Sequence, residues 1–533
     1  MKTKHAVLAV LLAILIAGFF ALPCRATAEA SAFPDAHAVL KDMGAGWNLG
    51  NSLDAWSGTQ TRIGPLSSET AWGNPVITRE LIALVKASGF RTIRLPVTWF
   101  NHMDPETNQI DEAWMSRVEE VVGWVLDEGM YCILNVHHDT GSDNWLIADS
   151  DGYAAREEKF TAIWHQIAER FASQGDHLLF EGYNEILNGS REWTRPDQAS
   201  LDAANRLNQA FVDTVRATGG NNATRCLIVN TYGAQPNALI TQGMRIPADT
   251  VEDRIIVEVH FYQPYQFTSE SYPGVTTWDK GSVDTSMANF DRDFIQKGYP
   301  VLIGEFGAVD KGKTKARFAW TKYVTDRAAA LGIGCIWWDN GAEKEYSLFD
   351  RRTLRVTQPE LIEIILTETG GANFDLTDEV VAQAESRLAK TNLCAAPEKW
   401  SAWIDTANGG GADVQYSVTG VHVTVSSPGK EAWHVQPAYV QLKIESGVTY
   451  RLSFDYSAEP AQEIPWHLMK DYGDYAAYQE GVLEAKNETQ HFELVFTMTE
   501  PTDGNCKIAF DLGGNEKAVP FVFEINNLTL VKE

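Results

Sequence analysis

Residues Leu178–Leu187 read LLFEGYNEIL, a short apolar run that breaks off in polar side chains. A continuous apolar run of about 4–8 residues is typical of a strand buried on both faces, as in a parallel sheet. The same pattern recurs seven more times along the chain, at Gly46–Gly50, Arg91–Pro96, Tyr131–Val136, Arg225–Asn230, Ile255–His260, Pro300–Gly304 and Gly332–Trp337. With Leu178–Tyr183 as the fourth, these runs predict eight short strands.

Stretches with helical periodicity separate these runs. Asp111–Asp127 places Trp114, Val118, Val121, Val122 and Val125 on one face, and Gly129 follows it. Similar stretches lie near Thr78–Ser88, Ala155–Ser173, Gln198–Ala217, Ser286–Lys297 and Lys313–Ala330. Regular alternation of strand and helix predicts an α/β fold of the (β/α)8 TIM barrel type. A doubly wound open sheet is the alternative, but no glycine-rich phosphate loop follows the first run.

The pattern changes after Thr369. Asp375–Lys390 is a polar helical stretch, and alternating strand patterns follow from about Leu393. They include YVQLKIE, TYRLSFDYSA, HFELVFTMT and FVFEINNLTLVK. Such alternation predicts an antiparallel β-sandwich. We therefore expect a barrel domain at 31–370, a linker region at 371–392 and a β-sandwich at 393–533.

The first residues carry a targeting pattern. Lys2 and Lys4 precede an apolar run that ends near Leu22, and small residues follow at Ala26–Ala28. This order is typical of a secretory signal peptide with an Ala-x-Ala cleavage site. The alternative is a membrane anchor, which the following cleavage site disfavours. We predict a signal peptide at 1–28 and a secreted, extracellular protein with no membrane association after cleavage.

Composition narrows the possible partners. Hydrophobic residues make up 44% of the chain and charged residues 22%, as in packed globular proteins. The formal net charge is -27, so a nucleic acid would be repelled and is excluded as a partner. Seventeen Trp residues is a high number, and flat sugar rings are one ligand class that uses them. Nothing in the sequence indicates an oligomer, and we expect a monomer.

Five cysteines remain after removal of the leader, an odd number that prevents complete pairing. Cys132, Cys226 and Cys335 lie inside apolar runs, so we expect buried free thiols there. Cys394 and Cys506 could pair in the C-terminal region, and the sequence leaves both possibilities open.

Polar residues collect where the predicted strands end, which is where a barrel of this type places its catalytic groups. They are Asn51, Arg94, His137, His138, Asn184, Glu185, His260, Tyr262, Glu305 and Trp338. Any one of these has an ordinary structural explanation. Their recurrence at nearly every strand end is difficult to obtain from loop composition alone.

Glu185 and Glu305 follow the fourth and seventh strands, on roughly opposite sides of the barrel. Glycosidic cleavage needs one carboxylic acid to protonate the leaving oxygen and a second, ionised carboxylate facing the anomeric carbon. Arg94 near Glu305 would keep that carboxylate ionised, and surroundings of lower polarity would keep Glu185 protonated. A metal site is the competing use of such residues, but no zinc motif such as HExxH is present. We expect neither a metal nor a cofactor.

Several motifs together resemble glycoside hydrolase family 5, especially its endo-β-1,4-glucanase (cellulase) branch. They are GWNLGNSLDAW, ETAWGNP, GFRTIRLPVTW, ILNVHHD, FEGYNE, EVHFY, IGEFG and IWWDNG, and they extend from about Gly46 to Gly341. The resemblance implies that Glu185 is the acid/base and Glu305 the nucleophile of a retaining reaction. It also implies that Asn184 binds the sugar 2-hydroxyl and that Arg94 and Tyr262 orient Glu305.

The same resemblance implies that His137 and His260 line the subsite at the cleaved bond and that Trp338 stacks on its sugar. His138 and Asn51 would be neighbouring substrate-binding residues. One departure is visible: the family usually has Pro after Asn-Glu, whereas Ile186 and Leu187 follow here. This changes the loop after the fourth strand and, with it, the subsites on the leaving-group side. Trp56, Trp72, Trp99 and Trp145 are candidate cleft platforms, each with a core role as the alternative.

The C-terminal region is similar to carbohydrate-binding modules of the β-sandwich type, on its strand pattern and a few anchors. Candidate sugar-binding aromatics are Trp400, Trp403, Trp433, Trp466, Tyr472, Tyr475 and Tyr478, of which half or more are expected in the core. A purely structural accessory domain is the alternative.

The sequence thus predicts a secreted endo-β-1,4-glucanase that hydrolyses cellulose and related β-glucans. Xyloglucan, mixed-link glucan or mannan as the substrate, with the same catalytic groups, is the alternative. A non-catalytic polysaccharide-binding protein is the alternative from another class, which the complete set of catalytic residues disfavours.

Overall fold

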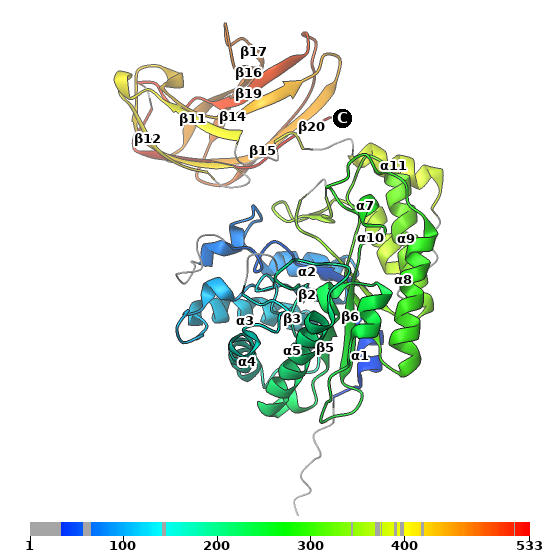
Figure 1. Cartoon of the computed structure of the whole chain (residues 1–533). Helices are drawn as coiled ribbons and strands as arrows, with labels where there is room; N and C mark the ends of the chain where they lie inside the picture. The colour runs from blue at the N-terminus through cyan, green and yellow to red at the C-terminus, as the bar shows by residue number, and fades with distance from the viewer. Residues whose placement is uncertain are drawn as a thin grey trace, which may run out of the picture.

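The computed structural model describes residues 33–56, 66–140, 145–342, 345–367, 374, 376–388, 392–394, 399–416, 420–515 and 517–532. The predicted signal peptide at 1–28 therefore lies wholly outside the described residues, and the predicted linker region at 371–392 lies partly outside them. Two folded parts follow one another along the chain (Figure 1).

The first part is a closed barrel of eight parallel strands in sequential order, as the sequence predicts. The strands are β1 (Gly46–Asn48), β2 (Thr92–Leu95), β3 (Tyr131–Asn135), β4 (Leu178–Glu181), β5 (Leu227–Asn230), β6 (Ile255–Phe261), β7 (Val301–Phe306) and β8 (Gly334–Trp337). Each predicted apolar run overlaps one of them, although β6 extends one residue and β7 two residues beyond the predicted ends. The predicted barrel is therefore confirmed.

Helices surround the strands (Figure 1). The main ones are α2 (Arg79–Ala87), α3 (Glu112–Asp127), α4 (Tyr153–Arg170), α5 (Gln198–Ala217), α8 (Lys280–Asp293), α9 (Thr314–Ala330) and α10 (Pro359–Thr367), with short α6 (Ala238–Gly243) and α7 (Tyr265–Thr268) between them. In α3 the Asp111 side chain accepts a hydrogen bond from the Trp114 N–H, which caps the helix. The predicted apolar face of α3 is buried.

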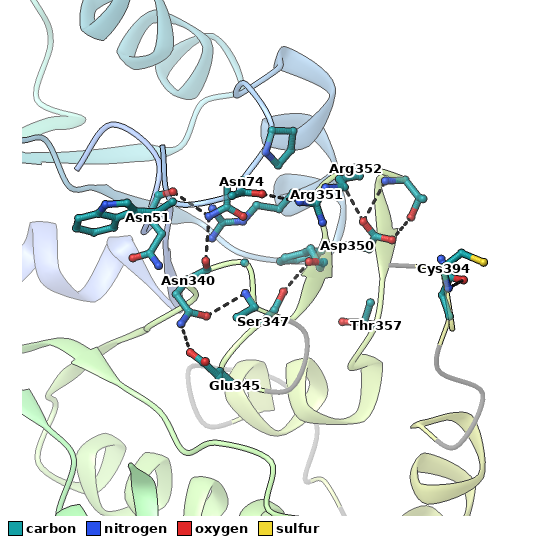
Figure 2. Close-up of a pocket in the computed structure, with 18 of the residues that line it drawn as sticks. Asn51, Asn74, Asn340, Glu345, Ser347, Asp350, Arg351, Arg352, Thr357 and Cys394 are labelled. Carbon is teal, nitrogen blue, oxygen red and sulfur yellow. Dashed lines mark hydrogen bonds between the residues drawn. The ribbon is translucent and has the colours of Figure 1, made fainter. Parts of the chain in front are cut away.

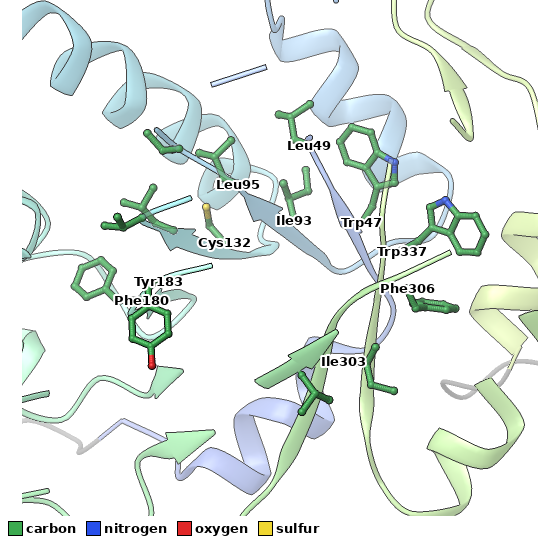
Figure 3. Packing of buried hydrophobic residues seen from close by; sticks show 14 of the residues in the cluster. Trp47, Leu49, Ile93, Leu95, Cys132, Phe180, Tyr183, Ile303, Phe306 and Trp337 are labelled. Carbon is green, nitrogen blue, oxygen red and sulfur yellow. The ribbon is translucent and has the colours of Figure 1, made fainter. Parts of the chain in front are cut away.

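Outward-facing strand residues pack against these helices in one continuous core (Figure 3). Trp47, Ile93, Cys132, Phe180 and Trp337 are among its fully or almost fully buried members. Because successive side chains of a strand point to opposite faces, the residues between these positions point into the barrel.

The barrel interior has an apolar floor and a polar layer above it. Helix α1 (Ala36–Met43) packs its Val39, Leu40 and Met43 against inward-facing Ile133 and Leu302, which closes the N-terminal end of the barrel. Further along the strands the inward positions become polar, although they stay buried, at Asn48, Arg94, Asn135, Glu181, Asn230 and Glu258. This buried polar layer supports the residues at the C-terminal ends of the strands.

The second part is an antiparallel β-sandwich, as predicted. One sheet has the order β11-β14-β19-β16-β17, with β11 (Trp400–Ile404), β14 (Val435–Ile444), β19 (Asp503–Phe510), β16 (Gln462–Lys470) and β17 (Ala477–Ala485). The other has the order β12-β13-β20-β15-β18, with β12 (Gly410–Tyr416), β13 (Val421–Pro428), β20 (Phe521–Lys532), β15 (Thr449–Glu459) and β18 (Gln490–Thr497). Helix α11 (Asp378–Leu388) coincides with the predicted polar helical stretch.

The described cysteines are all buried free thiols: Cys132, Cys226, Cys335, Cys394 and Cys506. The first three are as predicted, and of the two possibilities for Cys394 and Cys506 the structure has the unpaired one. Among the described helices, none combines the length and the apolar character that crossing a bilayer requires.

Candidate active site

A cavity of about 680 Å³ opens at the C-terminal ends of the barrel strands. All of the site residues predicted from the sequence except Arg94 line it: Asn51, His137, His138, Asn184, Glu185, His260, Tyr262, Glu305 and Trp338. Arg94 lies beneath this cavity with no exposed surface. The structure therefore brings the predicted residues together in one place.

The two predicted catalytic carboxylates approach each other closely. A carboxylate oxygen of Glu185, a ring nitrogen of His260 and a carboxylate oxygen of Glu305 all lie within 4.8 Å of one another. Side-chain exposure is 26% for Glu185 and 7% for Glu305. The expectation that Glu185 has the less polar surroundings is therefore wrong, because Glu185 is the more exposed carboxylate and also contacts a His.

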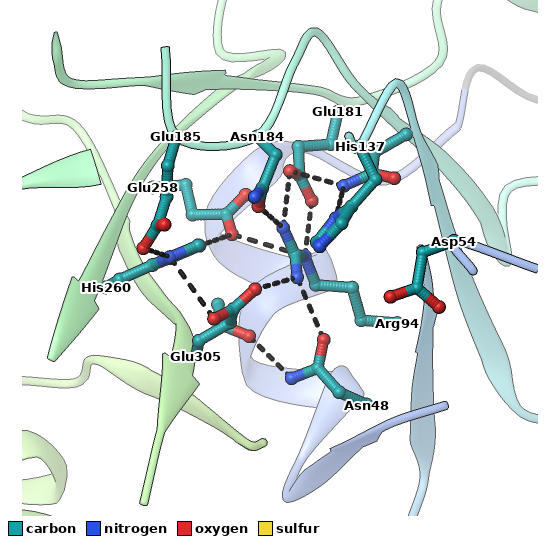
Figure 4. A network of polar contacts seen from close by, with 12 residues as sticks. Asn48, Asp54, Arg94, His137, Glu181, Asn184, Glu185, Glu258, His260 and Glu305 are labelled. Atoms are coloured by element: carbon teal, nitrogen blue, oxygen red, sulfur yellow. Dashed lines mark hydrogen bonds and ion pairs between the residues drawn. The ribbon is translucent and has the colours of Figure 1, made fainter. Parts of the chain in front are cut away.

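Arg94 organises the buried layer below Glu185 and Glu305 (Figure 4). Its guanidinium donates to Glu181 through two nitrogens, at 2.6 and 2.8 Å, and to Glu305 Oε1 at 2.7 Å. It also donates to Asn48 Oδ1 at 2.9 Å and to Asn184 Oδ1 at 2.8 Å. Its planar fork of donors thus fixes residues from β1, β4 and β7 relative to one another.

Glu305 is held from two sides. The Tyr262 hydroxyl donates to Glu305 Oε2 at 3.0 Å, and Arg94 donates to Oε1. Burial raises the pKa of Glu305 above its ordinary value, while His260 and Arg94 oppose the rise. Arg94 therefore favours the ionised form as the sequence predicted, but burial outweighs it.

His260 joins the two carboxylates. Its Nδ1 lies 2.8 Å from Glu185 Oε1 and 3.4 Å from Glu305 Oε2. Burial opposes the charged imidazolium, but Glu305 and Glu185 outweigh it and raise the pKa of His260 to about 10. His260 thus donates to Glu185 from Nδ1 and contacts both carboxylates.

The other predicted residues form the walls of the cavity. The rings of His137 and Trp338 are parallel, with centroids 6.0 Å apart and an interplanar angle of 2°. Burial lowers the pKa of His137 well below its ordinary value, and the neighbouring His138 and Arg94 add to this. His138 Nε2 lies 3.5 Å from an oxygen of the buried Asp54.

A second cavity of about 470 Å³ adjoins the first and shares Asn51, Trp72, Asn340 and Glu345 with it. Asn74 shapes the shared wall by donating to the carbonyls of Asn51 and Asn340 (Figure 2). Gly341 has φ +76°, and a Cβ at this position would come within 1.9 Å of Asn74 Oδ1. Only glycine fits there.

The four candidate tryptophan platforms of the barrel differ in exposure and in whether they line the cavity. Trp72 is 39% exposed and lines both cavities, whereas Trp99 is fully buried and donates to the Asn135 carbonyl. Trp145 donates to the buried Asp139, and Trp56 packs edge-on against Phe100. Trp72 is therefore the one of the four that faces the cleft.

The departure after Asn184-Glu185 has a packing explanation. Ile186 is fully buried and Leu187 is 3% exposed, and their carbonyls accept hydrogen bonds from Gly233 and Ala148. This anchors the loop that carries Trp193, which is 41% exposed and lines the cavity. The sequence predicted an altered loop but did not identify Trp193.

Two buried acids were also missed. Glu181 is the last residue of β4, and Glu258 precedes His260 by two residues on β6. The two-residue spacing on β6 places Glu258 on the inward face together with His260. That parity was readable from the sequence and would have identified Glu258.

In the sandwich the candidate aromatics divide between core and surface. Trp400 and Trp466 are 7% and 3% exposed, whereas Trp403 is 60% exposed. Trp433, Tyr472 and Tyr475 are also exposed, and the Tyr478 hydroxyl donates to Asp503.

Comparison with known families identifies the barrel. The model of the cellulase family, glycosyl hydrolase family 5, matches residues 53–344, more than half of the chain. The chain belongs to glycosyl hydrolase family 5. Within this family-5 chain a second model, described as a carbohydrate binding domain, matches residues 396–518. This second match covers most of the sandwich.

Individual relatives agree with this assignment. Endoglucanase A of Ruminococcus albus is 40% identical over 329 residues, which cover 59% of this chain and 87% of the relative. The cellulase/esterase CelE of Acetivibrio thermocellus is 39% identical over 344 residues, 62% of this chain. The match covers only 40% of CelE, so most of that relative has no counterpart here.

Among solved structures, the family-5 barrel is similar to a broad-specificity endoglucanase from Ruminococcus champanellensis with bound cellotriose. The two are 41% identical with a TM-score of 0.59, and the match covers 62% of this chain and 98% of the other.

Proposed function

We propose that this family-5 protein is a secreted endo-β-1,4-glucanase that acts by a retaining, double-displacement mechanism. The observation that carries the proposal is the approach of the Glu185 and Glu305 oxygens within 4.8 Å. Retaining glycosidases have carboxyl groups about 5 Å apart, whereas inverting enzymes leave about 6.5–9.5 Å for a water molecule. The predicted leader at 1–28 supports export.

In the first step Glu305 attacks the anomeric carbon as the glycosidic C–O bond breaks. Glu185 gives its proton to the leaving oxygen, and a glycosyl ester forms on Glu305. Arg94 and Tyr262 each hold one oxygen of Glu305, which orients the carboxylate for this attack. Arg94 also donates a hydrogen bond to the side-chain oxygen of Asn184. The amide N–H groups of Asn184 are therefore left to donate to the sugar 2-hydroxyl.

In the second step Glu185 removes a proton from water, which attacks the anomeric carbon and releases Glu305. Two inversions retain the β configuration. His260 donates to Glu185 from Nδ1 and stabilises the carboxylate that Glu185 becomes between the two steps.

Exposed aromatics favour an extended chain as the substrate. Trp72 comes from the connection between β1 and β2, and Trp193 comes from the connection between β4 and β5. These connections lie in different parts of the barrel mouth, and both Trp side chains line the same cavity. Sugar platforms on two sides of the catalytic pair support internal cleavage of a β-glucan.

We also propose that the sandwich binds polysaccharide on the outer face of the sheet that contains β14 and β19. Gln436 and Asp511 are each only 8% exposed there and share a hydrogen bond of 2.7 Å. Lys507 donates to Gln436, and His467 contacts Asp511. The exposed Trp403 is the register neighbour of Gln436 on β11. Polar groups fixed in a network beside an aromatic face suit a sugar chain.

The first test is release of reducing ends from carboxymethyl cellulose, mixed-link β-glucan, xyloglucan and mannan. Wild type, Glu305→Gln and Glu252→Gln are compared; Glu252 is exposed and precedes β6, at the opposite end of the barrel from the cleft. The proposal expects activity on the first two substrates that Glu305→Gln abolishes and Glu252→Gln retains.

Preference for xyloglucan or mannan would keep the mechanism and change the substrate. A folded wild-type protein that releases nothing from any of the four polysaccharides would refute the enzyme function. Binding without hydrolysis in the same samples would then favour a polysaccharide-binding protein.

A further inference from the structure

A third buried carboxyl group lies directly below the catalytic pair. Glu258 sits on β6 two residues before His260, so both side chains point into the barrel, and Glu258 has no exposed surface. Its Oε1 lies 3.4 Å from Arg94 Nε and 3.4 Å from His260 Nε2. Neither carboxyl oxygen has a hydrogen-bond partner among the described residues.

The barrel is shaped around this carboxyl group. A Cβ at Gly304, on the adjacent β7, would come within 1.6 Å of Glu258 Oε1. The register between β6 and β7 also shifts between Val259 and His260, one residue beyond Glu258. On the other side of β6, the register partner of Glu258 is the buried Asn230. The absent side chain at Gly304 therefore provides the space that Glu258 occupies.

Charge balance constrains the protonation of Glu258. The charged and titratable groups that act on it are Arg94 on β2, Glu181 on β4 and His260 on β6. His260 in turn faces Glu305 on β7 and Glu185, which follows β4. His137, after β3, stays uncharged because burial lowers its pKa. Arg94 and His260 are thus the two cations of this buried layer.

Before the reaction, Glu181 and Glu305 are the two carboxylates that balance these cations, and Glu185 carries the proton. After the first step Glu305 is an ester and Glu185 has become the second carboxylate. The layer is neutral in both states only if Glu258 keeps a proton throughout. A buried, uncompensated charge costs several kcal/mol, so the neutral arrangement is favoured.

We propose that Glu258 is a positioning residue that works in its protonated, uncharged form and acts on the catalytic pair through His260 and Arg94. The inference rests on the proposed function, since it assumes the roles of Glu185 and Glu305. An uncharged Glu258 leaves Arg94 to hold Glu305 and leaves His260 to donate to Glu185. An ionised Glu258 would attract Arg94 through Nε and His260 through Nε2, away from the carboxylates that these residues hold through Nη1 and Nδ1. It would also oppose the negative charge that Glu185 acquires.

The proton on Glu258 is retained only over a limited pH range. Burial, followed by the charge of Glu181, raises the pKa of Glu258 to about 7. The proton is therefore retained in acid and lost as the pH rises through neutrality. We expect the alkaline loss of activity to include this ionisation of Glu258.

The test compares pH profiles of kcat/KM for wild type, Glu258→Gln and the surface control Glu252→Gln. A carboxamide at 258 imitates the protonated acid, so the acid limb of Glu258→Gln should coincide with that of wild type. Above neutral pH the variant should keep its activity, and its ratio to wild type should rise by about threefold or more by pH 8. A ratio that stays constant with pH, or an acid limb displaced to lower pH, would overturn the proposal.

A second readout needs neither activity nor a folded Glu258 variant. Glu185→Gln protein is labelled with 13C at the Glu side-chain carboxyls and titrated by NMR. One Glu carboxyl should still titrate near neutral pH, since Glu185 is absent; no such resonance would overturn the proposal. Because this titration does not depend on hydrolysis, failure of the proposed function is distinguished from failure of this inference.

Discussion

The Tyr262 hydroxyl offers the cleanest single-atom test of how the nucleophile is held. It donates to Glu305 Oε2 at 3.0 Å, while Arg94 holds the other oxygen. Tyr262→Phe removes this donor and leaves the ring. A hydrogen bond to a charged group is worth about 1.5–3 kcal/mol, which corresponds to about one to two pH units or a factor of at least ten.

The sign of the effect follows from the form that the hydroxyl stabilises. The donor favours the ionised carboxylate, so its loss raises the pKa of Glu305 further in the direction in which burial already raises it. We expect the acid limb of kcat/KM to move to higher pH by about one unit, and kcat at the optimum to fall about tenfold.

The assay is the pH dependence of hydrolysis of a soluble cello-oligosaccharide. Tyr346→Phe is the matched control for the acid limb, because its ring contacts that of Tyr262 but its hydroxyl donates to the Thr268 carbonyl. An acid limb that moves equally in both variants, or in neither, would refute the reasoning that Tyr262 stabilises the charged form of Glu305.

Three further predictions concern packing, linkage and the sandwich. Gly304→Ala should destabilise the barrel by about 1–3 kcal/mol and reduce activity, since its Cβ would overlap Glu258. The control Gly123→Ala has open space on α3 and should stabilise the protein by up to about 1 kcal/mol. Thermal unfolding measures both changes. Because the pKa of Glu258 rises from 4.5 to about 7 on folding, wild type should lose about 3 kcal/mol of stability between these pH values, and Glu258→Gln should not lose this contribution. The free energy of unfolding is measured by urea unfolding at each pH, and the same dependence on pH in both proteins would contradict this. Trp403→Ala should reduce retention of the full chain on insoluble glucan by about tenfold while hydrolysis of a soluble oligosaccharide is unchanged, and unaltered retention would exclude this face as the binding surface.

Most of the barrel could be predicted from the sequence because each strand is buried on both faces. That burial requires an apolar run, and the helices between runs need one apolar face each. Boundaries depend on local contacts that periodicity does not report. Helix α8 was predicted from Ser286 to Lys297, but Asp279 caps it at Ser282 N, so it begins at Lys280 and ends at Asp293. Residues Ile295–Lys297 then form a 3-10 helix, which Gly298 caps.

The candidate site was predictable as a set of strand ends but not as a network. Arg94 contacts groups on β1, β4 and β7, and those contacts exist only once the barrel closes. The inward position of Glu258 was readable from its two-residue spacing to His260, but the space that it occupies depends on Gly304 on another strand. The relative exposure of Glu185 and Glu305 depends on where the strands end, because Glu305 lies within β7 whereas Glu185 lies beyond the end of β4.

Trapping the covalent intermediate would identify the nucleophile and distinguish a retaining from an inverting reaction. The protein is incubated with a 2-deoxy-2-fluoro cellobioside that carries an activated leaving group, then digested and analysed by mass spectrometry. We expect one glycosyl adduct on the peptide that contains Glu305, and a β-anomer as the first product of natural substrate by NMR. An adduct on a different residue, or an α-anomer released first, would contradict it.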